Sequence, residues 1–250
     1  MTQKQLIQNP AGEDLYVQIE GPEDADVIIV YVHGFGSHMN EGYALEFVKA
    51  FFDKYRIVRF DFSSCGQSVG KQEDICFKKM KDDLKVVLDY VDKEFEGSIG
   101  IVAHSMGAFV VSLLSPDGID KSVFTGVPNA DTWHLASQLQ NRILKRLGGT
   151  VDEIGISSYP RNDGTIQKLG PCFWRDLKEF EPVKMFSEYA NKTKLYVIHP
   201  LQDEVVGEQF IEDYKKIEKA EFVELPGNHN FTKPEDRKQL ILKIKEFFEN

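Results

Sequence analysis

Short apolar runs alternate along this chain with stretches in which apolar residues recur at the three- and four-residue spacing of a helix. The runs are typical of strands buried on both faces of a sheet, and the periodic stretches are typical of amphipathic helices. The predicted strands are Val27–Val32, Tyr55–Phe60, Ile99–Val102, Ser122–Val127, Leu195–Ile198 and Glu221–Leu225, and the clearest predicted helices lie within 43–52, 80–95 and 232–248. This alternation predicts an α/β domain with a mostly parallel, doubly wound sheet.

Two segments depart from the alternation. The opening residues read as two short strands joined by a turn at Ala11–Asp14, which predicts a β-hairpin. The stretch 128–193 separates two predicted strands that a simple crossover would join with far fewer residues. We expect this stretch to be a small cap inserted into a core formed by 1–127 and 194–250. An ordinary long crossover packed on the sheet edge is the alternative.

Helix boundaries are suggested at two places. Within the insertion, Ala136, Leu139 and Ile143 have helical spacing and are followed by a pair of glycines, which predicts a short amphipathic helix. Near the C-terminus, Thr232 and Glu235 have the spacing of a capping box, with a proline between them. We therefore expect Thr232 to cap the last helix.

The segment Ala103–Gly107 (Ala-His-Ser-Met-Gly) lies between a predicted strand and a predicted helix, with Ser105 at the bend. A tight strand-to-helix turn needs small residues around the serine, because the two backbones cross closely there. Such a turn presents the serine hydroxyl at the carboxyl end of the sheet, beside a helix N-terminus. Ser105 is thus a candidate nucleophile, although an ordinary strand-to-helix turn can have the same pattern.

A nucleophilic serine needs a base, and the base needs an acid that orients it. His229 lies between the last predicted strand and the last predicted helix, where a loop histidine can reach the serine. Asp203 follows the strand that ends near His199, and its carboxylate can accept the Nδ1 proton of a histidine. Glu204 is the rival of Asp203 for this role. His199 itself is expected to pack within the core.

The same chemistry needs two N–H donors for a developing oxyanion. The backbone amide of Met106, at the start of the helix after Ser105, is one candidate. The amide of Phe35 is the other, because the flanking Gly34 and Gly36 let this backbone approach a substrate closely.

These motifs together resemble the α/β-hydrolase superfamily. The chain order Ser105, Asp203, His229 is the order that this family uses, and the loops at His33–Gly36 and Asp61–Ser68 resemble two of its conserved loops. The resemblance is to serine esterases of the feruloyl or cinnamoyl esterase and monoacylglycerol lipase type. It implies an α/β-hydrolase fold with a small inserted cap, and a mainly structural role for Asp61–Ser68. Ala103 replaces a glycine that is usual in the family.

The composition narrows the classes of function. The chain has 250 residues and a net charge of −10, which disfavours nucleic acid and anionic membrane surfaces as partners. No run of apolar residues is long enough to span a bilayer. Cys65, Cys76 and Cys172 are odd in number and form no Cys-x-x-Cys pair, which favours a reducing compartment. We therefore expect a cytoplasmic protein, either a monomer or a homodimer.

The sequence thus predicts a serine hydrolase that cleaves small acyl or aryl esters through an acyl-enzyme, with no metal ion and no organic cofactor. A thioesterase, an amide hydrolase or a receptor-like module with a slow triad are the alternatives. Candidate substrate contacts are Gly34, His104, Trp133 and Trp174. The cap aromatics could equally serve only to pack the cap onto the sheet.

Overall fold

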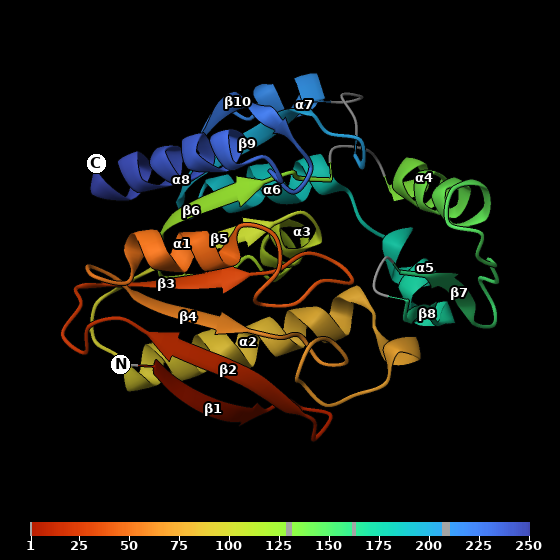
Figure 1. The fold of residues 1–250 in the computed structure, drawn as a ribbon, viewed down its shortest axis with the longest axis horizontal. Coiled ribbons are helices and arrows are strands. Elements are labelled where there is room, and N and C mark those ends of the chain that lie inside the picture. The colour runs from red at the N-terminus through yellow and green to blue at the C-terminus, as the bar shows by residue number, and fades with distance from the viewer. Residues whose placement is uncertain (1, 129–131, 162–163, 207–210) are drawn as a thin grey trace.

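The computed structural model describes residues 2–128, 132–161, 164–206 and 211–250. Within these residues, eight strands form one sheet in the order β1-β2-β4-β3-β5-β6-β9-β10 (Figure 1). Their bounds are Thr2–Gln8 (β1), Asp14–Glu20 (β2), Val27–Val32 (β3), Arg56–Phe60 (β4), Ser98–His104 (β5), Ile119–Thr125 (β6), Lys194–Gln202 (β9) and Ala220–Asn228 (β10). The β1–β2 and β2–β4 pairs are antiparallel and the other pairs are parallel, so the predicted hairpin and the mostly parallel sheet are confirmed.

Helices cover both faces of this sheet (Figure 1). Side chains of β3 alternate between the two apolar layers: Ile28, Val30 and Val32 belong to one, and Ile29 and Tyr31 to the other. The first layer is completed by α2 (Phe77–Glu94), α3 (Met106–Leu114) and α6 (Pro182–Ala190), and the second by α1 (Ala44–Phe51) and α8 (Pro234–Glu249). This doubly wound arrangement explains why the central strands read as continuous apolar runs.

Four elements from the stretch predicted as an insertion form a group beyond the carboxyl ends of the strands (Figure 1). We call α4 (Thr132–Lys145), β7 (Ser157–Pro160), β8 (Ile166–Leu169) and α5 (Pro171–Leu177) the cap. Phe173 of α5 stacks on Phe77 at 5.4 Å between ring centroids, and the Asp176 carboxylate accepts the Lys78 N–H at 3.1 Å. The cap therefore sits on the N-terminal end of α2. The helix α6 packs beside α3 on the core, and the predicted division at 128 and 193 stays a prediction.

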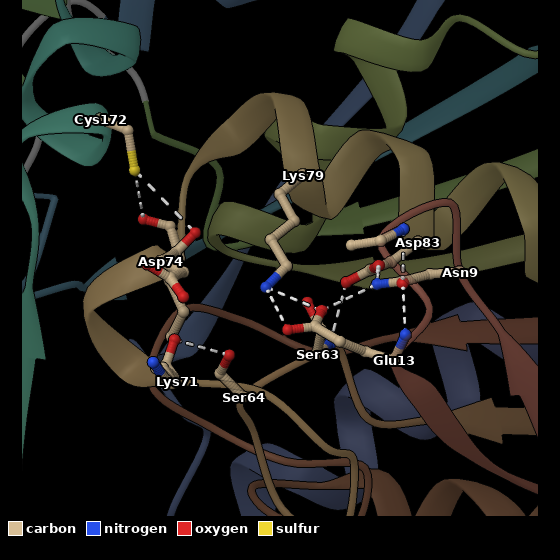
Figure 2. A network of polar contacts seen from close by, with 11 residues as sticks. Asn9, Glu13, Ser63, Ser64, Lys71, Asp74, Lys79, Asp83 and Cys172 are labelled. Atoms are coloured by element: carbon tan, nitrogen blue, oxygen red, sulfur yellow. Dashed lines mark hydrogen bonds and ion pairs between the residues drawn. The ribbon is translucent and has the colours of Figure 1, made fainter.

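A polar network fixes the hairpin to α2 and to the loop after β4 (Figure 2). The buried Asp83 carboxylate accepts Asn9 Nδ2–H at 2.7 Å and the Ser63 N–H at 2.9 Å. Lys79 forms an ion pair with Glu13 at 2.8 Å. Since the partners come from three separate segments, this network holds the loop after β4 in one position.

That loop in turn supports the segment after β3. Asp61 accepts the Met39 N–H at 2.7 Å and the Gln67 N–H at 2.8 Å. Gly66 has φ +50°, and a Cβ there would lie 2.1 Å from the Asp61 carboxylate. The contacts of this loop are structural, and they keep the upper edge of the sheet in place.

The last helix corrects one prediction. Its N-cap is Lys233 and Pro234 is its first residue, and no side chain caps it. The Thr232 hydroxyl instead accepts Asn228 Nδ2–H at 2.9 Å, so the predicted capping box at Thr232 and Glu235 is wrong. The hydroxyl is used to close the loop before the helix.

Two smaller elements complete the description, η1 (Gln72–Asp74) and α7 (Ile211–Lys215). Cys65, Cys76 and Cys172 are free thiols. Within the described residues, every helix falls short of the length or the apolar character that a bilayer-spanning segment requires.

Candidate active site

Ser105 occupies a sharp turn between β5 and α3. Its backbone angles are φ 53° and ψ −123°, which a non-glycine residue rarely adopts. Its N–H donates to the Thr125 carbonyl oxygen at 2.8 Å. A Cβ on Gly107 would lie 2.6 Å from the carbonyl oxygens of both Val32 and His33, so only glycine fits where α3 crosses β3. The predicted requirement for small residues at this turn therefore has a physical cause, which is the close approach of the α3 and β3 backbones.

Ser105, His229 and Asp203 lie in hydrogen-bonding contact, although they are far apart in the sequence. The distance from His229 Nδ1 to Asp203 Oδ2 is 2.8 Å, and that from His229 Nε2 to Ser105 Oγ is 3.0 Å. A carboxylate only accepts, so Nδ1–H donates to Asp203 and Nε2 is left to accept the Ser105 hydroxyl proton. This tautomer is the one that can remove a proton from the serine.

The Asp203 carboxylate is buried but well supplied with donors. Its Oδ1 accepts the N–H groups of Val205 and Val206, both at 2.9 Å. Burial by itself raises the pKa of Asp203, but the hydrogen bonds and the charge interaction with His229 bring that pKa below its usual value. Asp203 is therefore an anion at neutral pH. Glu204 makes a different contact, in which its carboxylate accepts the His229 backbone N–H at 3.2 Å.

The loop after β3 lies against the serine turn. A Cβ on Gly34 would lie 3.2 Å from Ser105 Cβ, so the two backbones are close. His33 fixes the loop, because its Nδ1–H donates to the Gly34 carbonyl oxygen at 2.7 Å and its Nε2 accepts the Phe62 N–H at 3.1 Å. Burial lowers the pKa of His33, which keeps this ring neutral.

Two backbone amides were predicted as oxyanion donors, those of Phe35 and Met106. Met106 is the first residue of α3, and the first N–H groups of a helix have no partner within it. Phe35 follows the close contact made by Gly34. Within the part of the chain that the structure describes, neither the Phe35 nor the Met106 N–H has a backbone acceptor.

The other candidate substrate contacts have different surroundings. Trp174 is 1% exposed, and its indole N–H donates to Ser157 Oγ at 2.9 Å, so it packs inside the cap. The side chain of Trp133 lies outside the described residues. His104 is buried behind the serine turn, with both ring nitrogens in hydrogen bonds. Phe173, another of the cap aromatics, is buried, and its ring centroid lies 4.9 Å from that of Phe35.

Sequence reasoning missed three polar residues around His104. Tyr43, Thr125 and Asn230 form a continuous series of hydrogen bonds with it. The available signals were weak: Thr125 lies at the carboxyl end of a predicted strand, and Asn230 follows His229. Among the described residues, no group of three or more metal-ligating side chains gathers at this edge.

Comparison with solved structures gives the same fold. Est1E from Butyrivibrio proteoclasticus, solved with ferulic acid bound, is 21% identical with a TM-score of 0.81, covering 98% of this chain and 97% of that one. The Pyrococcus furiosus esterase Pf2001 is 19% identical (TM-score 0.71; 100% and 90% covered). Mouse alpha/beta hydrolase domain-containing protein 10 is 18% identical (TM-score 0.71; 99% and 98% covered). At these identities the likeness shows the fold.

Comparisons of sequence agree with this fold. An uncharacterised protein, R595, of Acanthamoeba polyphaga mimivirus is 22% identical over 215 residues, which is 83% of this chain and 68% of that protein. The model of a hydrolase family described as serine aminopeptidase, S33, matches residues 23–214, which is well over half of the chain. The chain therefore has the α/β-hydrolase fold and belongs to this serine aminopeptidase-like family of α/β hydrolases.

Proposed function

We propose that this protein is a serine hydrolase that cleaves carboxylic esters through an acyl-enzyme intermediate. The observation that carries the proposal is the line from Ser105 Oγ through His229 to Asp203, with distances of 3.0 and 2.8 Å. A hydroxyl, an imidazole and a buried carboxylate in this order form the arrangement that activates a serine.

In the proposed reaction, Ser105 Oγ attacks the ester carbonyl carbon while His229 Nε2 takes the hydroxyl proton. The Phe35 and Met106 amides donate hydrogen bonds to the oxyanion of the tetrahedral intermediate. The imidazolium of His229, stabilised by Asp203, then protonates the leaving alcohol, and the acyl group stays on Ser105. A water molecule that loses a proton to His229 Nε2 then attacks the acyl carbon. The bond to Ser105 Oγ breaks, His229 returns the proton to this oxygen, and the acid is released.

The proposed substrates are small molecules with an acyl or aryl ester. The Pyrococcus furiosus neighbour is an esterase by name, and Est1E was solved with ferulic acid bound, which supports an ester over other acyl compounds. Phe35, which is half-buried and packs on the buried Phe173 ring, offers an apolar surface for such a group. Thioesters and amides react by the same steps, and the family description favours an amide bond as the second candidate. A panel of matched esters, thioesters and anilides separates these substrates by kcat/KM.

The test of the proposed function is turnover of a short-chain p-nitrophenyl ester. We expect clear activity in the wild-type protein and a loss of several orders of magnitude in Ser105→Ala, because only binding and oxyanion contacts remain. Ser187→Ala, at an exposed serine of α6, is the matched control and should retain full activity. A fluorophosphonate probe should label Ser105 alone. Equal rates for wild type and Ser105→Ala would contradict the mechanism, and ligand binding without turnover would favour a receptor-like module.

A further inference from the structure

His104, the residue before Ser105, is enclosed by groups from three segments. Its ring is 6% exposed, and its centroid lies 4.9 Å from that of His229. Its Nδ1 is 2.9 Å from Thr125 Oγ1, and its Nε2 is 3.1 Å from Asn230 Oδ1. The ring thus bridges the end of β6 and the loop that carries His229.

The hydrogen bonds around His104 run in one direction. An amide oxygen only accepts, so His104 Nε2–H donates to Asn230. Burial, together with the neighbouring His229, holds the pKa of His104 at about 3, so the ring is neutral and its Nδ1 accepts from the Thr125 hydroxyl. Thr125 Oγ1 in turn lies 2.7 Å from the hydroxyl of the buried Tyr43, which donates to it. The result is a hydrogen-bonded chain of side chains that runs from Tyr43 to Asn230.

The chain ends on the loop of the proposed base. Asn230 directly follows His229, and the next residue, Phe231, has φ 48° in a tight turn closed by its N–H on the Asn228 carbonyl oxygen at 2.9 Å. A Cβ on Gly126 would lie 3.1 Å from the His229 ring and 3.2 Å from the His104 ring. The two imidazoles are therefore packed against one another with no spare room on this side.

The same chain is joined to the nucleophile. The Thr125 carbonyl oxygen accepts the Ser105 N–H at 2.8 Å, while its hydroxyl donates to His104. A shift of the His229 loop relative to the serine would therefore break or stretch the bond between His104 and Asn230. Since His104 carries no charge, it makes this link without repelling an imidazolium at His229.

We propose that His104 is a positioning residue, which holds the His229 loop in register with Ser105 through its hydrogen bond to Asn230. The proposal rests on the proposed function, since it assigns a role within that same site. In the proposed reaction, His104 and Asn230 do not contact the reacting atoms. They set the distance across which the serine proton moves, and a small displacement of a base lowers the rate of a proton transfer steeply.

The experiment removes the acceptor at the exposed end of this series of hydrogen bonds, the side chain of Asn230. Asn230 is exposed, so Asn230→Ala leaves the core intact. We expect kcat on a p-nitrophenyl ester to fall about tenfold with KM unchanged, because the base is less well placed but substrate binding is not. Asn230→Asp keeps an acceptor oxygen and should recover most of kcat. Lys233→Ala, an exposed side chain at the start of α8, is the matched control and should behave as wild type.

A double-mutant cycle separates this role from a general loss of structure. If His104 and Asn230 act through one bond, the variant His104→Phe/Asn230→Ala loses no more kcat than His104→Phe alone. Independent losses that multiply would overturn the proposal, as would an Asn230→Ala kcat within twofold of wild type, or an Asn230→Asp variant as slow as Asn230→Ala. Failure of the proposed function looks different, since wild type and Ser105→Ala would then turn over the ester equally slowly.

Discussion

The edge of the sheet formed by the carboxyl ends of its strands carries Ser105, and the cap lies beside it. Both regions are tightly packed, but by different kinds of contact. At the edge, buried polar groups are matched one to one, as in the bonds from Asp203 to His229 and from His229 to Ser105. In the cap, aromatic rings fill the space, with Phe173 between Phe77 and Trp174. Directional bonds fix the distances between atoms, whereas apolar contacts mainly exclude water. Changes at the edge should therefore reduce catalysis, and changes in the cap should reduce stability.

The largest expected effect follows from replacing Asp203. In Asp203→Asn the side-chain amide presents an N–H to His229 Nδ1, so the ring proton moves to Nε2 and the base can no longer accept from Ser105. We expect kcat for ester hydrolysis to fall by about 10⁴ at unchanged fold.

Steady-state kinetics with circular dichroism measures this loss. Asp213→Asn, at a partly exposed aspartate of α7 that pairs with Lys216, is the matched control and should keep wild-type activity. Similar kcat values for Asp203→Asn and Asp213→Asn would contradict the expectation that changes at the edge reduce catalysis.

The features of the active-site edge that could be predicted from the sequence are those set by local chain geometry. A strand followed by small residues around a serine predicts the turn at Ser105, and the structure has it with φ 53°. The loop positions of Asp203 and His229 follow from the strand ends, because parallel strands bring their carboxyl ends to one edge. The alternation of strands and helices was predictable from the apolar pattern along the chain, and the predicted fold is confirmed.

Contacts between distant segments left no local signal. Tyr43 and Thr125 are 82 positions apart and meet only in the folded protein, where the residue before α1 lies against the end of β6. The cap strands β7 and β8 have four residues each, too short for a periodic pattern to stand out. Thr232 shows a different error, in which the capping pattern gave way to another local contact, the hydrogen bond from Asn228 four residues earlier.

A second prediction concerns the pH dependence of stability, which should come from the edge. Burial lowers the pKa of His104 to about 3, whereas a histidine in the unfolded chain takes up a proton near pH 6.5. Between these values the unfolded state binds more protons, so the free energy of unfolding falls as pH falls. His33, whose pKa burial also lowers, acts in the same direction. The depressed pKa of Asp203 contributes stability that is lost only at still lower pH.

Going from pH 7 to pH 5, we expect the buried His104 to lower the free energy of unfolding by about 2 kcal/mol, and His33 to add to the fall. Denaturant unfolding at a series of pH values measures the slope. His104→Phe should reduce the slope by one histidine's share, whatever its effect on activity. An unchanged slope in that variant would mean that His104 is not held neutral in the folded protein.

The smallest expected effect lies in the cap. Ser157 Oγ is buried, accepts the Trp174 indole N–H at 2.9 Å and the Asp152 N–H at 2.8 Å, and donates to the Asp152 carbonyl oxygen at 3.1 Å. Ser157→Ala leaves these donors without their acceptor, which should lower the free energy of unfolding by about 1–2 kcal/mol. The reacting groups are untouched, so kcat should stay within about twofold of wild type. Thermal unfolding and ester turnover measured on the same samples test both the loss of stability and the retained kcat.

Ser158→Ala is the matched control. The Ser158 hydroxyl makes one exposed hydrogen bond, to Thr150 at 3.2 Å, so its removal should cost less than about 0.5 kcal/mol. A large loss of kcat in Ser157→Ala without a loss of stability would show that the cap shapes the reacting site directly, and would end the division between a catalytic edge and a packing cap.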